Sequence, residues 1–253
     1  MGFQGLTGFG GGISYLNGAA AVSGDYVTDD LVFNVDASEN SSYSGSGNTW
    51  TDIAGSNNVS LQNCGYTSSN GGGITFLVSS SWSIGEFTTP VASTSSQSWE
   101  VWTNAIQGSG FPGSPYSWIL HNHNSGQTTG SSYHTMGIDG SNNFFGAFDG
   151  QFSNMTYTGA TSSSSTIYHL IMTWDGSNQK FYVDGTERSS RALGAYNTWN
   201  NNNYNTTTTM GEAIGGNYRP IDGNIYSVRV WDRALTGAEV TQNWNANKAK
   251  FNR

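Results

Sequence analysis

Few residues in this chain have the types and spacing that a catalytic site requires. Hydrolysis of a glycosidic bond takes two carboxylates that face each other across the sugar, roughly 5–5.5 Å apart in retaining enzymes and 6.5–9.5 Å in inverting ones. The nearest arrangement, Asp184-Gly185-Thr186-Glu187, straddles a turn, and Glu100 stands alone among aromatic residues. Cys64 has no base beside it, and no Gly-x-Ser-x-Gly elbow supplies a nucleophile. We therefore expect no catalytic residue and no enzymatic activity.

Three histidines could bind a transition metal. His121 and His123 have the spacing that puts both rings on one face of a strand, and His134 joins them if the intervening loop is a hairpin. The alternative is a polar row on a solvent-facing sheet, because no nearby carboxylate strengthens the site. His121, His123 and His134 are thus candidate ligands of an unknown metal.

One long loop combines aromatic rings with amide side chains. Residues 196–205 read YNTWNNNNYN, and no strand pattern accounts for their rings. Sugars pack their apolar faces on aromatic rings, and amides hydrogen-bond their hydroxyl groups. Trp199, Tyr204 and Asn201 are therefore candidate glycan-binding residues. Alternatively, Trp199 folds back onto the core or packs against a neighbouring subunit.

The distribution of charge argues against a nucleic-acid binder. Only 10% of the residues are charged, and the first basic residue is Lys180. Residues 1–179 carry eleven acidic and no basic side chains, whereas the rest of the chain carries six acidic and nine basic ones. A protein that binds DNA or RNA needs Lys and Arg to neutralise phosphates, so neither is an expected partner.

The sequence predicts neither a membrane-spanning protein nor one held together by disulfides. No uninterrupted apolar run reaches the roughly 18–20 residues that cross a bilayer, and the start of the chain lacks the basic segment of a secretory signal. Because Cys64 is the single cysteine, no disulfide can form within the chain. Aromatic residues make up 13% of the sequence, which is enough to build a core without one.

Alternating apolar and polar residues predict an all-β protein. The pattern is clear in Leu31–Val35, Ser98–Trp102 and Tyr168–Trp174, and clusters of Gly, Ser and Asn separate such segments. Asp175-Gly176 predicts a hairpin turn between Tyr168–Trp174 and Gln179–Val183.

The C-terminal part predicts a short helix. Thr236 and Glu239 have the spacing of a capping box, and Leu235 and Val240 occupy the positions of a hydrophobic staple around it. The basic residues near the end of the chain suit the negative end of the helix dipole and need no partner. These are Lys248, Lys250 and Arg253.

The first 24 residues predict an attachment arm. They are rich in glycine, carry no charge and cannot form a core of their own. We expect the arm to lie against the domain or a neighbouring subunit through its large apolar residues, namely Phe3, Leu6, Phe9, Ile13 and Tyr15.

The hairpin and the C-terminal segments resemble laminin-G-like, or concanavalin A-like, jelly-roll domains. The similarity is carried by Tyr168–Trp174, by Phe181–Gly185 and by Gly223–Trp231 with the Leu-Thr-x-x-Glu motif after it. It implies a two-sheet antiparallel jelly-roll sandwich with a short C-terminal helix, formed by residues 25–253 behind an arm at residues 1–24. The Glu-x-Asp-x-Glu cluster of the jelly-roll glucanases is missing, which again argues against hydrolysis.

The same resemblance raises the question of calcium. Members of the family often bind it, and Asp36, Asp52, Asp139 and Asp149 offer oxygen ligands, although no loop spaces them as a cage. We expect no other cofactor.

A narrower resemblance concerns Leu31–Ala37 and Ser42–Asp52. These segments are similar to modules on virion proteins of tailed bacteriophages. This implies a non-enzymatic virion structural protein at the virion surface, a capsid decoration or fibre protein attached through its arm. Its partners would be other virion proteins and further copies of itself. The alternative is a lectin-like adhesin that binds host-surface polysaccharide.

Overall fold

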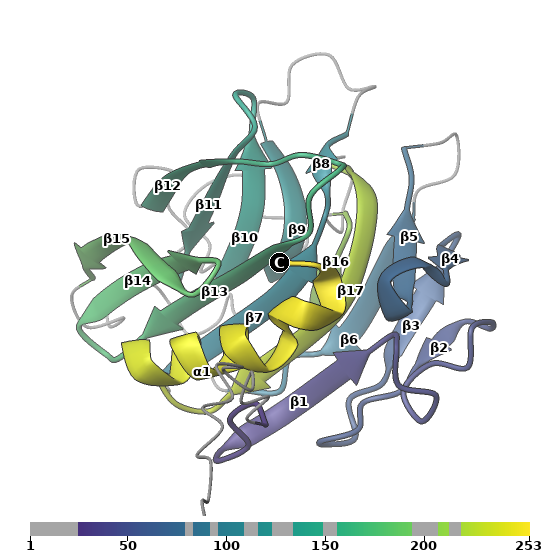
Figure 1. Cartoon of the computed structure of the whole chain (residues 1–253), viewed down its shortest axis with the longest axis horizontal. Coiled ribbons are helices and arrows are strands. Elements are labelled where there is room, and N and C mark those ends of the chain that lie inside the picture. The colour runs from purple at the N-terminus through teal and green to yellow at the C-terminus, as the bar shows by residue number, and fades with distance from the viewer. Residues whose placement is uncertain are drawn as a thin grey trace, which may run out of the picture.

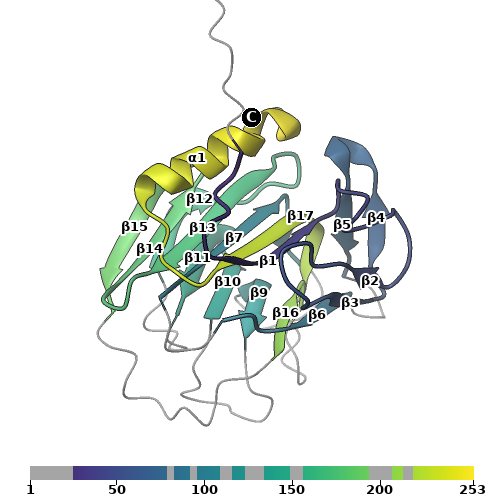
Figure 2. The ribbon, with the colours of Figure 1, turned by 90° about the horizontal axis from the view of Figure 1, so that it is seen from below.

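Two antiparallel sheets face each other in the computed structural model (Figures 1 and 2). The structure describes residues 25–78, 83–91, 96–108, 116–122, 134–148, 156–193, 207–212 and 219–253. The predicted arm, with Phe3, Leu6, Phe9, Ile13 and Tyr15, lies outside these residues, as do His123 and the loop residues Trp199, Asn201 and Tyr204. The predicted sandwich with a C-terminal helix is confirmed.

The first sheet has nine strands among the described residues. Along it lie β15 (Thr186–Ala192), β14 (Asn178–Val183), β13 (Tyr168–Trp174), β7 (Gln97–Thr103), β17 (Ile221–Trp231), β5 (Gly73–Phe76) and β4 (Gly65–Thr67). The long strand β17 also pairs with β1 (Leu31–Asp36) and β8 (Ile106–Gln107). The earliest described strand therefore lies beside the last one.

The second sheet has eight strands in the described part of the chain. Their order is β12 (Thr156–Thr161), β11 (Asn143–Ala147), β10 (His134–Asp139), β9 (Tyr116–Asn122), β16 (Thr207–Met210), β6 (Ile84–Thr88), β3 (Val59–Gln62) and β2 (Thr49–Trp50).

The core fills the space between the sheets. Strand β7 shows how the alternation builds it: Trp99 and Val101 point into the main core cluster, whereas Glu100 and Trp102 lie on the outer face of their sheet. That outer face is also buried, so every residue of β7 is inaccessible to solvent. Burial on both faces explains why β7 is dominated by large side chains.

Helix α1 (Gly237–Asn247) covers the outer face of the nine-stranded sheet (Figure 2). Its capping box forms as predicted, since Thr236 accepts from the Glu239 amide and the Glu239 carboxylate accepts from the Thr236 amide. Leu235 and Val240 share one buried cluster, as expected for a staple. Further along the helix, Trp244 stacks on Trp102 with 5.4 Å between ring centroids. No helix of the described residues is long and apolar enough to span a membrane.

The C-terminal cations correct one expectation. Helix α1 ends at Asn247 with no basic residue in its last turn, and the 3₁₀ helix η4 (Lys248–Phe251) follows. Lys250 binds both oxygens of Asp36 at 2.9 and 3.1 Å, and Arg253 binds Asp184. Two of the three cations therefore fasten the C-terminal segment to acidic groups of the sheet, rather than only meeting the helix dipole. A second 3₁₀ helix, η1 (Ser69–Gly71), lies beside η4.

Candidate functional site

A row of aromatic residues crosses the outer face of the eight-stranded sheet, which lies opposite the face that α1 covers. Trp118 of β9 and Phe145 of β11 are both in register with Gly137 of β10, and Phe145 is in register with Tyr157 of β12. A Cβ atom on Gly137 would meet the Phe145 ring at 2.7 Å and the Ser117 carbonyl oxygen at 2.5 Å. The glycine thus lets the rings of Trp118 and Phe145 meet, 5.5 Å apart and nearly perpendicular.

Two tyrosines lie against this pair of rings. Tyr116 contacts Phe145 edge-on at 5.3 Å and Tyr157 contacts it at 5.9 Å. Trp118 and Phe145 are buried, whereas 42% of Tyr157 is exposed to solvent. The result is a buried aromatic base with an accessible phenol ring at its edge, an arrangement that gives a ligand a fixed surface.

Arg219 supports the same cluster. Its guanidinium carbon lies 5.6 Å from the centroid of the Tyr116 ring and 5.2 Å from that of Trp118, within the range of cation–π attraction. Its carbonyl oxygen accepts from the Trp118 amide, and its own amide donates to Glu212 Oε1 at 2.6 Å. We call Tyr116, Trp118, Phe145, Tyr157 and Arg219 the Tyr157 site.

The phenol of Tyr157 is held in its neutral form. Burial raises the pKa of Tyr157, and a hydrogen bond with Tyr116 and the nearby carboxylate of Asp139 raise it further. The site therefore presents a neutral hydroxyl beside the ring across the physiological pH range.

The predicted histidine cluster does not form between the two histidines that the structure describes. His121 is in register with Thr135 and stacks on Trp118 at 4.8 Å, on the outer face. His134 is in register with Asn122, the next residue along β9, and therefore points to the opposite face. The hairpin was expected correctly, but its register separates the two rings.

His134 instead belongs to the core. Its ring lies 6.0 Å from that of Trp99 and 5.4 Å from that of Phe148. Burial lowers the pKa of His134 to about 3, so the ring is neutral. Among the described residues there is no group of three or more His, Cys, Asp or Glu side chains that could hold a metal ion.

The carboxylates considered for calcium serve other partners. Asp52 accepts main-chain N–H groups of the loop that follows it, and Asp139 accepts those of Ser141 and Asn143. Asp36 binds the ammonium of Lys250 and the guanidinium of Arg229. The three do not converge, and Asp149 lies outside the described residues, so this arrangement does not fit a calcium ion.

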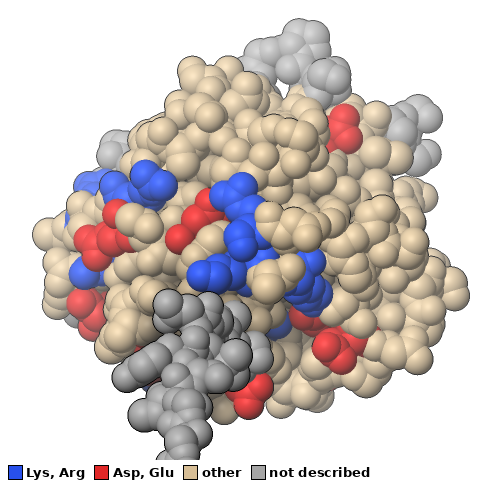
Figure 3. Space-filling model, viewed as in Figure 1, with Lys and Arg blue, Asp and Glu red and all other residues tan. Residues whose placement is uncertain are grey.

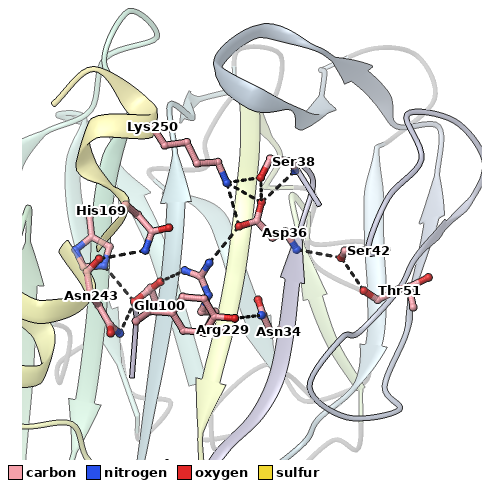
Figure 4. A network of polar contacts seen from close by, with 12 residues as sticks. Asn34, Asp36, Ser38, Ser42, Thr51, Glu100, His169, Arg229, Asn243 and Lys250 are labelled. Carbon is pink, nitrogen blue, oxygen red and sulfur yellow. Dashed lines mark hydrogen bonds and ion pairs between the residues drawn. The ribbon is translucent and has the colours of Figure 1, made fainter. Parts of the chain in front are cut away.

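A buried charge network lies on the other side of the sandwich, beneath α1 (Figure 4). Arg229 of β17 donates to Glu100 Oε1 at 2.6 Å and to Asp36 Oδ2 at 3.1 Å. All three side chains are almost completely buried. Glu100, which stands alone in the sequence, therefore has a partner 129 residues away.

Further polar groups complete the network around Glu100. Asn243 of α1 donates to Glu100 Oε2 at 2.8 Å, and His169 Nε2 lies 3.2 Å from the same oxygen. Burial alone would raise the pKa of Glu100, but Arg229 and His169 hold it at about 2. The pKa of Asp36 is likewise lowered, because the charges of Lys250 and Arg229 outweigh its burial. Both carboxylates are ionised and bound, so removal of a partner would leave a buried charge uncompensated.

Comparison with known proteins identifies the family of this sandwich domain. A laminin G family described as the concanavalin A-like lectin/glucanases superfamily matches residues 79–241, more than half of the chain. The chain belongs to this family. No curated protein matches the sequence.

Solved structures agree with the concanavalin A-like fold. A Trypanosoma rangeli sialidase in complex with sialic acid is similar over 91% of this chain and 35% of its own, with 15% identity and a TM-score of 0.66. The binding domain of botulinum neurotoxin DC in complex with rat synaptotagmin II is similar over 86% of this chain and 52% of its own, with 13% identity and a TM-score of 0.62.

A third structure concerns botulinum neurotoxin type C, whose cell entry depends on two ganglioside molecules. It covers 86% of this chain and 51% of its own, with 14% identity and a TM-score of 0.61. The concanavalin A-like chain thus spans about a third of the sialidase chain and about half of the neurotoxin chains. At such low identity these similarities show the fold alone.

The Tyr157 site was not predicted from the sequence, and neither was the strand that carries Tyr157, β12. Alternation in this concanavalin A-like domain does not say which face of a strand is inward, so it could not place Trp118 and Phe145 on the outer face. Gly137 was the available signal, since a glycine within a strand marks a close approach.

Proposed function

We propose that this protein is a lectin-like module that binds carbohydrate through the Tyr157 site. The observation that carries the proposal is a half-exposed tyrosine ring fixed on a buried aromatic base, on the outer face of the eight-stranded sheet. The apolar face of a pyranose packs on such a ring, and the adjacent hydroxyl groups hydrogen-bond the sugar. The family to which the chain belongs, described as the concanavalin A-like lectin/glucanases superfamily, supports this assignment.

Replacing Tyr157 with alanine should reduce glycan affinity by at least about tenfold, because truncation of a central aromatic contact typically costs more than about 1.4 kcal/mol. The measurement is a glycan array on the purified protein, followed by titration of the strongest ligand. Tyr66→Ala is the matched control, since Tyr66 is 37% exposed but lies on β4 of the other sheet. A flat array from folded protein, or equal losses in the two variants, would contradict the proposal.

The loop around Trp199 is proposed as a second glycan contact. Trp199, Asn201 and Tyr204 lie outside the described residues, so their support comes from composition. Trp199→Ala belongs in the same titration.

We propose no catalytic activity. Glu100 and Asp36, two carboxylates brought together by the fold, are buried and share Arg229. A glycosidase needs one carboxyl group that can donate a proton, whereas the low pKa values of both groups keep them ionised. Release of reducing ends during the glycan titrations would contradict this proposal.

We also propose a more specific role at the virion surface. The protein would be a decoration or fibre protein whose partners are other virion proteins and further copies of itself. The similarity of Leu31–Ala37 and Ser42–Asp52 to virion modules supports this role, and so do the contacts of the segment that follows the arm. The Val27 amide donates to Asn243 Oδ1 of α1 at 2.8 Å, and its carbonyl accepts from Trp231 Nε1 at 3.0 Å. An arm attached to a particle would thus be joined firmly to the sandwich.

Deletion of residues 2–24 should leave a folded sandwich that is lost from purified particles. Circular dichroism and particle composition by mass spectrometry are the measurements. Normal incorporation of the deletion variant into particles would contradict the attachment role.

A further inference from the structure

The outer face of the eight-stranded sheet has little positive charge. The strands of this sheet, from β2 to β16, contain no Lys or Arg, and the segments outside the described residues contain none either. Arg219 is the cation placed on this face by the described residues. The Lys and Arg side chains seen in Figure 3 instead gather on the face that α1 covers.

The guanidinium of Arg219 is engaged within the protein. It lies over the rings of Tyr116 and Trp118, and its main chain is bonded to both Trp118 and Glu212. A cation used in this way fixes the aromatic cluster. Arg219 is partly exposed, and the buried carboxylate of Glu212 accepts its main-chain amide, so an acidic group accompanies its charge.

The carboxylate of Asp139 lies beside the Tyr157 site. Asp139 is in register with Tyr116, so both side chains lie on the same face of the sheet. The negative charge of Asp139 raises the pKa of the Tyr157 phenol. Glu86 lies further along this face, in register with Thr209 and bonded to Gln62. Glu212 adds a third carboxylate next to Arg219. A ligand stacked on Tyr157 therefore lies near the Asp139 carboxylate, whereas the buried Glu212 accompanies Arg219.

We infer that the Tyr157 site selects uncharged sugars and rejects carboxylated or sulfated ones. The inference rests on the carbohydrate binding proposed above and names its ligand class. An acid group on the sugar would be placed near Asp139 within a chain of formal net charge −8, so like charges would repel both at contact and during approach.

The experiment compares matched glycans on one array. Each acidic oligosaccharide is printed beside the same oligosaccharide after desialylation, desulfation or reduction of its carboxyl group. In about 10 mM salt we expect the uncharged member of each bound pair to bind at least about tenfold more tightly. In about 0.5 M salt this ratio should shrink, because the screening length falls from roughly 30 Å to a few ångströms.

Asp139→Asn tests the assigned source of the repulsion. Asparagine keeps an oxygen that can accept the amides of Ser141 and Asn143, so the turn is retained. The variant should gain affinity for acidic sugars and keep its affinity for uncharged ones. Asp175→Asn is the control, because Asp175 accepts two turn amides in the same way on the other sheet.

The outcomes separate the two proposals. Acidic sugars that bind as tightly as their uncharged partners, with loss on Tyr157→Ala, would overturn the charge selection and leave carbohydrate binding standing. Equal effects of Asp139→Asn and Asp175→Asn would also overturn it. Binding to no glycan, or binding that Tyr157→Ala does not change, would remove the proposed function itself.

Discussion

Replacing Arg229 with methionine is expected to lower the free energy of unfolding by about 3–5 kcal/mol, the cost of breaking a buried ion pair from one side. The arginine bridges Glu100 and Asp36, and neither carboxylate can reach water once the guanidinium is gone. Asn243 and Lys250 would still bind one carboxylate each, but Glu100 would lose the main charge that offsets its burial. Urea unfolding of the purified protein measures the loss.

Arg233→Met provides the control. Arg233 also binds a carboxylate through two nitrogens, at 3.0 and 2.7 Å from Glu239, but about a quarter of each side chain is exposed. An accessible pair of this kind contributes at most about 1 kcal/mol. Adding Glu100→Leu to Arg229→Met should recover part of the stability, because the stranded charge is then removed. Similar losses in the two arginine variants would contradict a specific role for the buried network.

Acid is expected to destabilise the protein through Glu100. The folded-state pKa of Glu100 is about 2, below its ordinary value of 4.5, so its contribution is present above pH 4.5 and is lost as the pH falls from 4.5 towards 2. At 1.36 kcal/mol for each unit of pKa difference, that contribution is about 3 kcal/mol. Glu100→Gln should therefore be less stable at neutral pH but lose less stability across this window.

Thermal unfolding from pH 7 to pH 2 measures both curves. Other carboxylates with lowered pKa values, such as Asp36 and Glu239, titrate in both proteins, so the difference between the curves isolates Glu100. Curves that run parallel from pH 4.5 to 2 would show that Glu100 does not carry the acid sensitivity.

Features set by neighbouring residues could be predicted from the sequence. The capping box joins Thr236 to Glu239 three positions away, and the hairpin turn forms where Asp175 accepts the amides of Ser177 and Asn178. Both depend on a few consecutive residues, so their spacing was sufficient. The sandwich fold followed from several such local patterns together with the family resemblance.

Features set by cross-strand register could not be predicted in the same way. The separation of His121 from His134 depends on a pairing of His134 with Asn122 that no local pattern states. The Tyr157 site likewise brings together residues of β9, β11 and β12 with Arg219, which lies in the segment that precedes β17. Arg229, the partner of Glu100, could not be predicted for the same reason. A single arginine between two valines does not indicate which strand lies beside it.

The pairing of β1 with β17 has a consequence for synthesis on the ribosome. Asp36 meets Arg229 193 residues later and Lys250 214 residues later, and Val27 meets Asn243 across 216 residues. The earliest described strand must therefore wait, with its apolar face uncovered, until β17, α1 and η4 have emerged. Closure of such long loops slows folding and leaves a partly made chain open to aggregation. This domain is thus completed after translation of its last elements, and a nascent chain that ends before β17 lacks the strand on which β1 pairs.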